Sequence, residues 1–188
     1  MTTPFHDHFA LHIAAVQNSI ADLEGPSESA SKAIVDCLRK GGKILTFGNG
    51  GSAAEASHLA EELVGRFKKD RRPFPAICLT ADSGTVTCIA NDFGYESLFV
   101  RQIDAFAQSG DVAIALTTSG KSENVNRGLR AAHLRGAVTI ALTGEAGLVG
   151  AEADHVIAVP SSDSAVVQEI HLVIIHLFCL AVEEIEVF

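Results

Sequence analysis

The sequence predicts an α/β fold, a five-stranded parallel sheet sandwiched by helices. Two observations predict it: five short, almost entirely apolar runs, and amphipathic segments of helix length between them. Parallel strands that are buried on both faces read as continuous apolar runs, and helices usually connect them. A third observation is that the segments after the runs are rich in small and hydroxyl residues, at the end of the strands where such folds bind ligands. With 188 residues, 47% of them hydrophobic, the chain is expected to be a single domain.

The first 40 residues are predicted to form two helices. From Phe5 to Leu23, apolar residues recur every three or four positions, which gives a helix one apolar face. Gly25-Pro26 is expected to end this helix, and a second is expected from Ser27 or Ser29 to Lys40. Because helices outside an α/β core often make oligomer contacts, we assign residues 1–40 to that role and residues 43–188 to the core.

The five apolar runs after residue 43 are predicted to be the strands. They are Ile44–Phe47, Ala76–Leu79, Val112–Leu116, Val138–Leu142 and Val156–Val159. Ligands bind beyond the carboxyl ends of parallel strands, and small or hydroxyl residues follow every one of these runs. A long helix from about Ser164 to Glu186 is expected to close the chain.

Composition and charge exclude several classes of partner. The formal net charge of −9 argues against nucleic acid, which normally requires a basic patch. The basic cluster Arg66–Arg72 is interpreted as a solvated loop, with assistance to an anionic substrate as the alternative. No uninterrupted apolar run reaches the roughly 18 residues of a membrane span, and Met1–Ala10 lacks a signal-peptide pattern, so we expect a cytoplasmic protein without a membrane partner. The four scattered cysteines are expected to be buried, reduced thiols.

Two predicted turns are candidate phosphate sites. Gly48-Asn49-Gly50-Gly51-Ser52 joins a strand to a helix, where free backbone N–H groups and the helix dipole attract an anion. Tight turns also need glycine when they bind nothing, so this signal is weak alone. Thr117-Thr118-Ser119-Gly120-Lys121-Ser122 follows another strand, and capping by Ser122 would use only one of its hydroxyls. The surplus hydroxyls favour ligand binding.

Histidine and carboxylate side chains on two predicted helices are the candidate chemical groups. His58 and Glu62 are four residues apart and share a helix face, where they could bind a metal, move a proton or form a simple surface pair. In the last helix, Gln168, His171 and His176 interrupt an apolar run, and a buried imidazole there must be hydrogen-bonded or ligated. Helical geometry does not choose between His171 and His176 as the partner of Gln168.

Asn91-Asp92-Phe93-Gly94-Tyr95 is a third polar insertion, after an apolar segment. It would ordinarily form an Asx turn, and a role in ligand binding is the alternative.

These segments together resemble a known family, the sugar isomerase (SIS) family with its flavodoxin-like domain, and within it the sedoheptulose 7-phosphate, or phosphoheptose, isomerases. The resemblance covers nearly the whole chain. It rests on five segments in order and spacing, namely Gly48–Ser52, His58–Phe67, Asn91–Gly94, Thr117–Ser122, and Gln168–His171 with His176 beyond.

The resemblance implies a homotetramer, with active sites at subunit interfaces, that converts sedoheptulose 7-phosphate to D-glycero-D-manno-heptose 7-phosphate. This reaction begins the biosynthesis of nucleotide-activated heptose. The resemblance also implies Glu62 as the base and His176 as the acid of an enediol proton transfer, and one zinc ion per subunit held by His58, Glu62, Gln168 and His176. The substrate-binding residues that it implies are Asn49, Gly50, Gly51, Ser52, Glu62, Arg66, Asn91, Asp92, Thr117, Thr118, Ser119, Ser122 and Gln168.

One departure from the family pattern is visible. Members commonly carry arginine two residues before the Gln-Glu pair, where this chain has Val166, so phosphate capture would depend more on backbone dipoles and hydroxyls. Two alternatives are therefore kept: a non-catalytic regulatory SIS protein that binds a phosphosugar, as relatives that bind a replication initiator do, and an isomerase of another phosphosugar. The presence of Glu62 together with His176 favours an enzyme.

Overall fold

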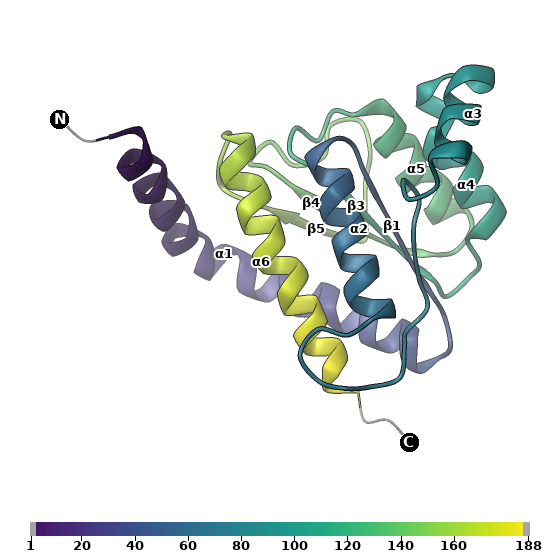
Figure 1. Cartoon of the computed structure of the whole chain (residues 1–188), viewed down its shortest axis with the longest axis horizontal. Helices are drawn as coiled ribbons and strands as arrows, with labels where there is room; N and C mark the ends of the chain where they lie inside the picture. Colours follow the sequence, from purple (N-terminus) through teal and green to yellow (C-terminus); the bar gives the residue numbers. More distant parts are fainter. Residues whose placement is uncertain (1–2, 186–188) are drawn as a thin grey trace.

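The computed structural model, which describes residues 3–185, contains the predicted parallel sheet with strand order β2-β1-β3-β4-β5 (Figure 1). Its strands are β1 (Ile44–Gly48), β2 (Ala76–Cys78), β3 (Val112–Thr117), β4 (Val138–Thr143) and β5 (His155–Ala158). The two central strands are buried throughout, which explains their continuous apolar runs. The strand order reverses between β1 and β3, so the ends of these two strands are the expected ligand site.

Helices cover both faces of the sheet, as predicted. They are α1 (Pro4–Arg39), α2 (Gly51–Val64), α3 (Ser83–Phe93), the short 3₁₀ helix η1 (Tyr95–Ser97), α4 (Leu98–Phe106), α5 (Glu123–Leu134) and α6 (Ser164–Glu183). One hydrophobic core lies between the sheet and α1, α2 and α6, and the other lies under α3, α4 and α5. Helices α2 and α6 therefore share one side of the sheet and pack against each other.

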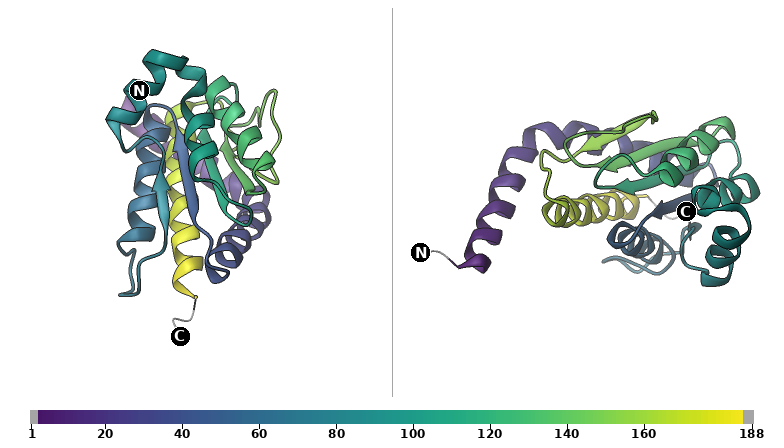
Figure 2. Two further views of the ribbon diagram at one scale, coloured as in Figure 1. Left: turned by 90° about the vertical axis from the view of Figure 1, so that its right-hand side faces the viewer. Right: turned by 90° about the horizontal axis from the view of Figure 1, so that it is seen from above.

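The prediction of two N-terminal helices is wrong, because α1 is one helix of 36 residues that contains Pro26. Proline removes one backbone hydrogen bond and crowds the preceding turn, which bends a helix without necessarily ending it. Figure 2 shows the bend and an N-terminal part of α1 that projects from the body of the molecule. The helix ends beside Gly41, whose positive φ of 82° is a typical stop.

Helix α6 begins at a capping residue, Asp163, whose carboxylate accepts hydrogen bonds from the backbone N–H groups of Ala165 and Val166. It ends at Glu183, and the predicted end at Glu186 lies outside the described residues. By length and composition α6 could cross a membrane, but half of its most apolar window is buried against the rest of the molecule, as in the core helix of a globular protein.

Two further expectations need correction. Three cysteines are buried, but Cys88 is exposed on α3. The basic cluster is more than a solvated loop, because the guanidinium of Arg71 donates hydrogen bonds to the carbonyl oxygens of Glu62 (2.7 Å) and Leu63 (2.9 Å). Arg71 thus satisfies carbonyl groups that are left free where α2 ends.

Candidate active site

The two predicted phosphate turns leave neighbouring strands on the same edge of the sheet. Gly48 at the end of β1 is paired with Leu116 of β3, so the glycine turn and the hydroxyl turn begin side by side. Each turn leads into a helix, α2 or α5, whose first backbone N–H groups lack helical partners. This edge therefore presents two helix N-termini to a single ligand, which suits an anion.

The glycine turn is shaped for close approach. Gly50, the residue before α2, has a φ of +57° and offers no side chain to cap the helix. A Cβ added to Gly51 would clash with the amide of Gln168 on α6. Glycine at these positions thus leaves the N–H groups uncovered and lets the Gln168 amide lie directly on the turn.

Asn49 is held in place by Asn124, which the sequence did not reveal, and by Tyr95, which the sequence placed in the third polar insertion without a role of its own. Its amide exchanges hydrogen bonds with that of Asn124 on α5, at 2.8 and 2.9 Å, and its oxygen accepts a third from the Tyr95 hydroxyl at 2.8 Å. Asn124 is buried at the start of α5, so it connects the glycine turn to the helix that follows the hydroxyl turn. The signal in the sequence that could have found Asn124 was its place two residues after Ser122, at the start of the helix that follows the hydroxyl turn.

The hydroxyl turn uses part of its polar capacity to hold its own shape. The Thr117 hydroxyl accepts a hydrogen bond from the Gly120 N–H, and the Ser119 hydroxyl accepts one from the Lys121 N–H, both at 3.2 Å. The Thr118 hydroxyl meets that of Ser164 on α6 at 3.3 Å. Ser122 precedes α5 but makes no side-chain capping bond, so the capping role considered for it is wrong and its hydroxyl is left for a ligand.

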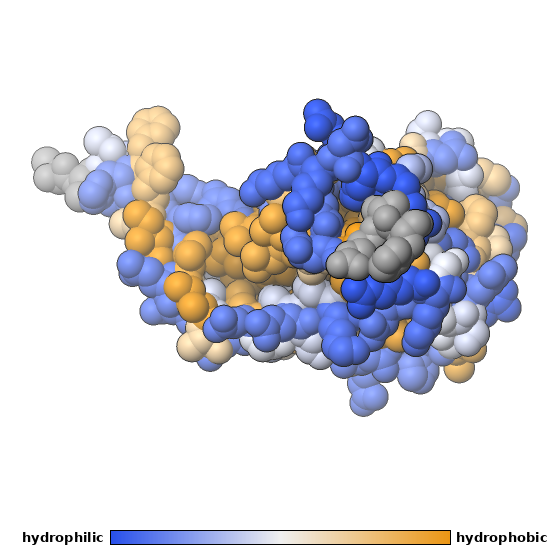
Figure 3. Space-filling model, turned by 90° about the horizontal axis from the view of Figure 1, so that it is seen from below, coloured by the Kyte–Doolittle hydropathy of each residue, from blue (hydrophilic) through white to orange (hydrophobic). Residues whose placement is uncertain are grey.

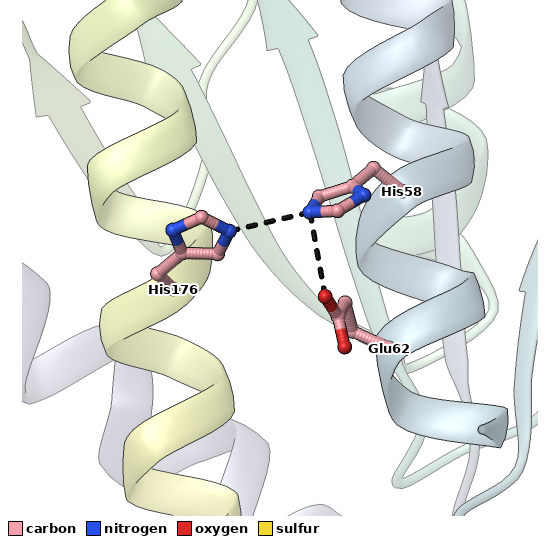
Figure 4. A group of neighbouring side chains, drawn as sticks. All are labelled: His58, Glu62 and His176. Carbon is pink, nitrogen blue, oxygen red and sulfur yellow. Dashed lines mark hydrogen bonds and ion pairs between the residues drawn. The ribbon is translucent and has the colours of Figure 1, made fainter. Parts of the chain in front are cut away.

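His58, Glu62 and His176 come together where α2 faces α6 (Figure 4). His58 Nε2 lies 3.2 Å from His176 Nε2 and 3.6 Å from a carboxylate oxygen of Glu62. The side chain of Glu62 is only 13% exposed, and Phe67 stacks on the His176 ring with centroids 5.0 Å apart. The cluster thus brings a partly buried carboxylate and two imidazoles together, which are side chains that can take part in proton transfer.

The same three side chains suit a divalent metal ion. One donor atom from each lies within 4.8 Å of the other two, a span that a common ion could bridge. Two imidazole nitrogens and one carboxylate oxygen are a typical zinc donor set that leaves a coordination position open. Gln168, the predicted fourth ligand, has its amide against Gly51 of the glycine turn in this structure.

The remaining predicted residues lie on other parts of the fold, and α3, which carries two of them, covers the opposite face of the sheet from the cluster. Asn91 and Asp92 are exposed in the last turn of α3, joined by a hydrogen bond of 2.7 Å, so the expected Asx turn is a helix end. They come shortly before Tyr95, the residue that holds Asn49. Arg66 is exposed just beyond α2, four residues after Glu62. Val166, at the usual arginine position, is 2% exposed and packs into the core.

The structure also separates the two histidines of α6. His176 belongs to the cluster, whereas His171 is fully buried, with Nε2 3.2 Å from the carbonyl oxygen of Thr143. Beside it lies Glu55 of α2, a residue that the sequence analysis missed. Its place on the inward face, between Ser52 and Leu59 at helical spacing, was the signal that could have found it.

Comparison with known proteins defines the class first. The family model described as SIS domain matches residues 8–144, and the chain belongs to this family. A phosphoheptose isomerase of Aquifex aeolicus is 53% identical over 152 residues, 80% of each chain. Solved structures of phosphoheptose isomerases from Francisella tularensis and Neisseria gonorrhoeae match with TM-scores of 0.93 and 0.88 at 35% and 37% identity. They cover 98% and 96% of this chain, and 100% and 97% of their own. Within the SIS family, the chain is therefore a member of the phosphoheptose isomerases.

Proposed function

We propose that the protein is an aldose–ketose isomerase that converts sedoheptulose 7-phosphate to D-glycero-D-manno-heptose 7-phosphate, the step that begins nucleotide-activated heptose biosynthesis. The observation that carries this proposal is the His58–Glu62–His176 cluster, assembled where α2, the helix that begins at the glycine turn, faces α6. Membership of the phosphoheptose isomerases supports the same substrate. A non-catalytic regulatory role is not favoured, because it would have no use for an assembled base and acid.

The reaction moves a carbonyl group from C2 of the ketose to C1 of the aldose. Glu62 takes the proton from C1 and returns it to C2, and His176 carries a proton between the two oxygens. A carboxylate and an imidazole can both act near neutral pH. Partial burial of Glu62 keeps competing water away from the enediol intermediate.

The substrate phosphate is placed in the two turns. Backbone N–H groups of Gly50, Gly51 and Ser52 and the hydroxyls of the Thr117–Ser122 turn surround it with donors, which an acidic protein needs in place of a basic patch. The phosphate contacts of that turn are assigned to Thr117, Thr118, Ser119 and Ser122, and the remaining substrate contacts to Asn49, Glu62, Arg66, Asn91, Asp92 and Gln168. A set of so many hydroxyl and amide groups suits a polyhydroxylated substrate.

A zinc ion is proposed as the cofactor, one per subunit. His58, Glu62 and His176 would hold it, with Gln168 as a fourth ligand after its amide turns from Gly51. When bound, zinc would polarise the substrate oxygens and favour the enediolate. Metal content of the purified protein should fall in His58→Ala, and metal-free native protein with full activity would show that zinc is not essential.

A homotetramer in the cytoplasm completes the proposal. Helices α1 and α6 line an apolar groove of about 620 Å³, and Phe5, Phe9 and Ile20 of α1 are more than 60% exposed. Figure 3 shows hydrophobic side chains along the N-terminal arm and in the hollow beside it. So much exposed apolar surface on one side is typical of a protein–protein interface. A second copy covering it would bring neighbouring subunits to the helices that carry the site.

The substrate is tested by incubating the protein with sedoheptulose 7-phosphate and, separately, with pentulose and hexulose phosphates. We expect kcat/KM to be highest for the heptulose phosphate, because several contacts reach beyond the reacting carbons. A higher value for a shorter sugar would replace the heptose assignment but keep the isomerase chemistry.

A further inference from the structure

A second carboxyl–imidazole pair lies inside the molecule, between the catalytic cluster and the sheet. Glu55 stands on α2 one turn before His58, and His171 stands on α6 one turn after Gln168. Glu55 Oε2 and His171 Nδ1 are 3.9 Å apart, with the two side chains 12% and 0% exposed. Within residues 3–185 neither of these two buried atoms has a hydrogen-bond partner. Buried polar atoms are usually hydrogen-bonded, so two unpaired atoms that face each other suggest a hydrogen bond between them.

The contact at the other ring nitrogen assigns the protons of His171. Nε2 lies 3.2 Å from the carbonyl oxygen of Thr143, and a carbonyl only accepts, so Nε2 carries a hydrogen. In a neutral ring Nδ1 is then an acceptor, and its facing atom, Glu55 Oε2, must supply the donor. A carboxyl oxygen can donate only when it is protonated.

Burial favours that state for both groups. It raises the pKa of Glu55 to about 8 and lowers the pKa of His171 to about 4. Near neutral pH the acid therefore keeps its proton and the ring stays uncharged. A neutral Glu55 also adds no negative charge beneath the N-terminus of α2, where the phosphate is expected.

We propose that the Glu55 carboxylic acid donates a hydrogen bond to His171 Nδ1, and that this bond is a positioning clamp that sets α2 against α6. The bond requires the two atoms, which are 3.9 Å apart in the structure, to approach to about 3 Å. Through the bond from His171 to Thr143, the clamp also ties both helices to the end of β4. Glu55 and His171 are thus positioning residues that keep His58 and Glu62 facing His176.

The effect on catalysis rests on the proposed isomerase function, whereas the hydrogen bond itself does not. A displacement of about 1 Å between catalytic groups can cost a hundredfold in rate. Removing the clamp should therefore lower kcat more than it raises KM, because the phosphate turns remain in place.

The test compares Glu55→Gln, Glu55→Ala and a control, Gln102→Ala. The amide of Gln102 is buried and donates to the carbonyl oxygens of Leu79 and Leu98 on the other face of the sheet, away from α2 and α6. Glutamine at position 55 keeps a neutral donor for Nδ1 and should hold kcat near the native value. Glu55→Ala should lower kcat about tenfold to a hundredfold. Gln102→Ala should lower thermal stability but leave kcat per folded molecule unchanged.

Spectroscopy tests the bond independently of activity. The infrared spectrum of the native protein at pH 7 should contain the carbonyl-stretch band of a protonated carboxylic acid, and Glu55→Gln should remove it. Native kcat in Glu55→Ala, or a native spectrum from which Glu55→Gln removes no such band, would overturn the proposal. If the native protein isomerises no ketose phosphate, the proposed function fails, and the band still decides whether the hydrogen bond exists.

Discussion

Glu62 is the residue whose replacement separates chemistry from binding. Glu62→Gln keeps the size of the side chain and the helix but removes the base, so we expect isomerase activity to fall by about 10²- to 10⁴-fold. Circular dichroism and the melting temperature should stay near native values, because Glu62 lies at the site and outside both hydrophobic cores. Undiminished turnover in this variant, or in His176→Ala, would end the proton-transfer assignment.

The buried pair makes a prediction about stability and pH. Glu55 has a folded-state pKa of about 8, above its unfolded value, so its contribution to stability is lost as pH rises from about 4.5 to 8. His171 has a folded-state pKa of about 4, below its unfolded value, so its contribution is gained from pH 4 to about 6.5. The two oppose each other in the acid range, and only the loss from Glu55 remains above pH 6.5.

Melting temperatures at fixed protein concentration test whether Glu55 lowers the stability of the native protein as pH rises above 6.5. The difference between Glu55→Gln and the native protein should increase in favour of the variant from pH 6.5 to 8, since the variant has no carboxyl group to ionise at that position. Curves that run parallel over this range would contradict the assignment of a buried neutral acid.

At the scale of elements, the glycine turn leading into α2 makes a testable contact with α6. Gly51→Ala would push a methyl group into the amide of Gln168, which can turn aside because it is the end of a flexible side chain. We expect a raised KM for the sugar phosphate, because the methyl group covers the turn, and a melting temperature near the native value.

Gly25→Ala is the matched control for that substitution. Gly25 has nothing within 4 Å of an added Cβ and lies inside α1, so alanine should stabilise the helix by roughly 0.5–1 kcal/mol. Its KM should stay native. An unchanged KM in Gly51→Ala as well would show that the turn does not touch the substrate.

The elements also show what the sequence could predict. Buried parallel strands appear in a sequence as short apolar runs, so the predicted ends of all five strands lie within about one residue of the observed ends. The helix break at Gly25-Pro26 was wrong because packing of α1 against α6 overrides a local stop signal. Spacing could place His58 and Glu62 on one face, but the contact with His176, 118 positions away in the chain, depends on how α2 meets α6. The sequence did not reveal Asn124 and Glu55, nor the role of Tyr95 within its polar insertion, because these residues act through tertiary contacts.

At the scale of the whole molecule, the exposed apolar arm predicts an oligomer. Phe9 and Ile20 of α1 are 68% and 62% exposed, so replacing both with aspartate should leave the fold intact while reducing the molar mass in light scattering from that of a tetramer. Leu134→Asp is the control, since Leu134 is 84% exposed at the end of α5 on the opposite side. A monomeric native protein, or a variant of unchanged mass, would disprove this interface.

Direct observation of the product by NMR decides whether the chain is the proposed isomerase. Native protein mixed with sedoheptulose 7-phosphate should produce the anomeric proton signal of an aldose heptose 7-phosphate, and Glu62→Gln should produce almost none over the same time. No aldose signal from folded, metal-supplied native protein, or equal signals from both proteins, would contradict the assignment of the His58–Glu62–His176 cluster as the catalytic centre.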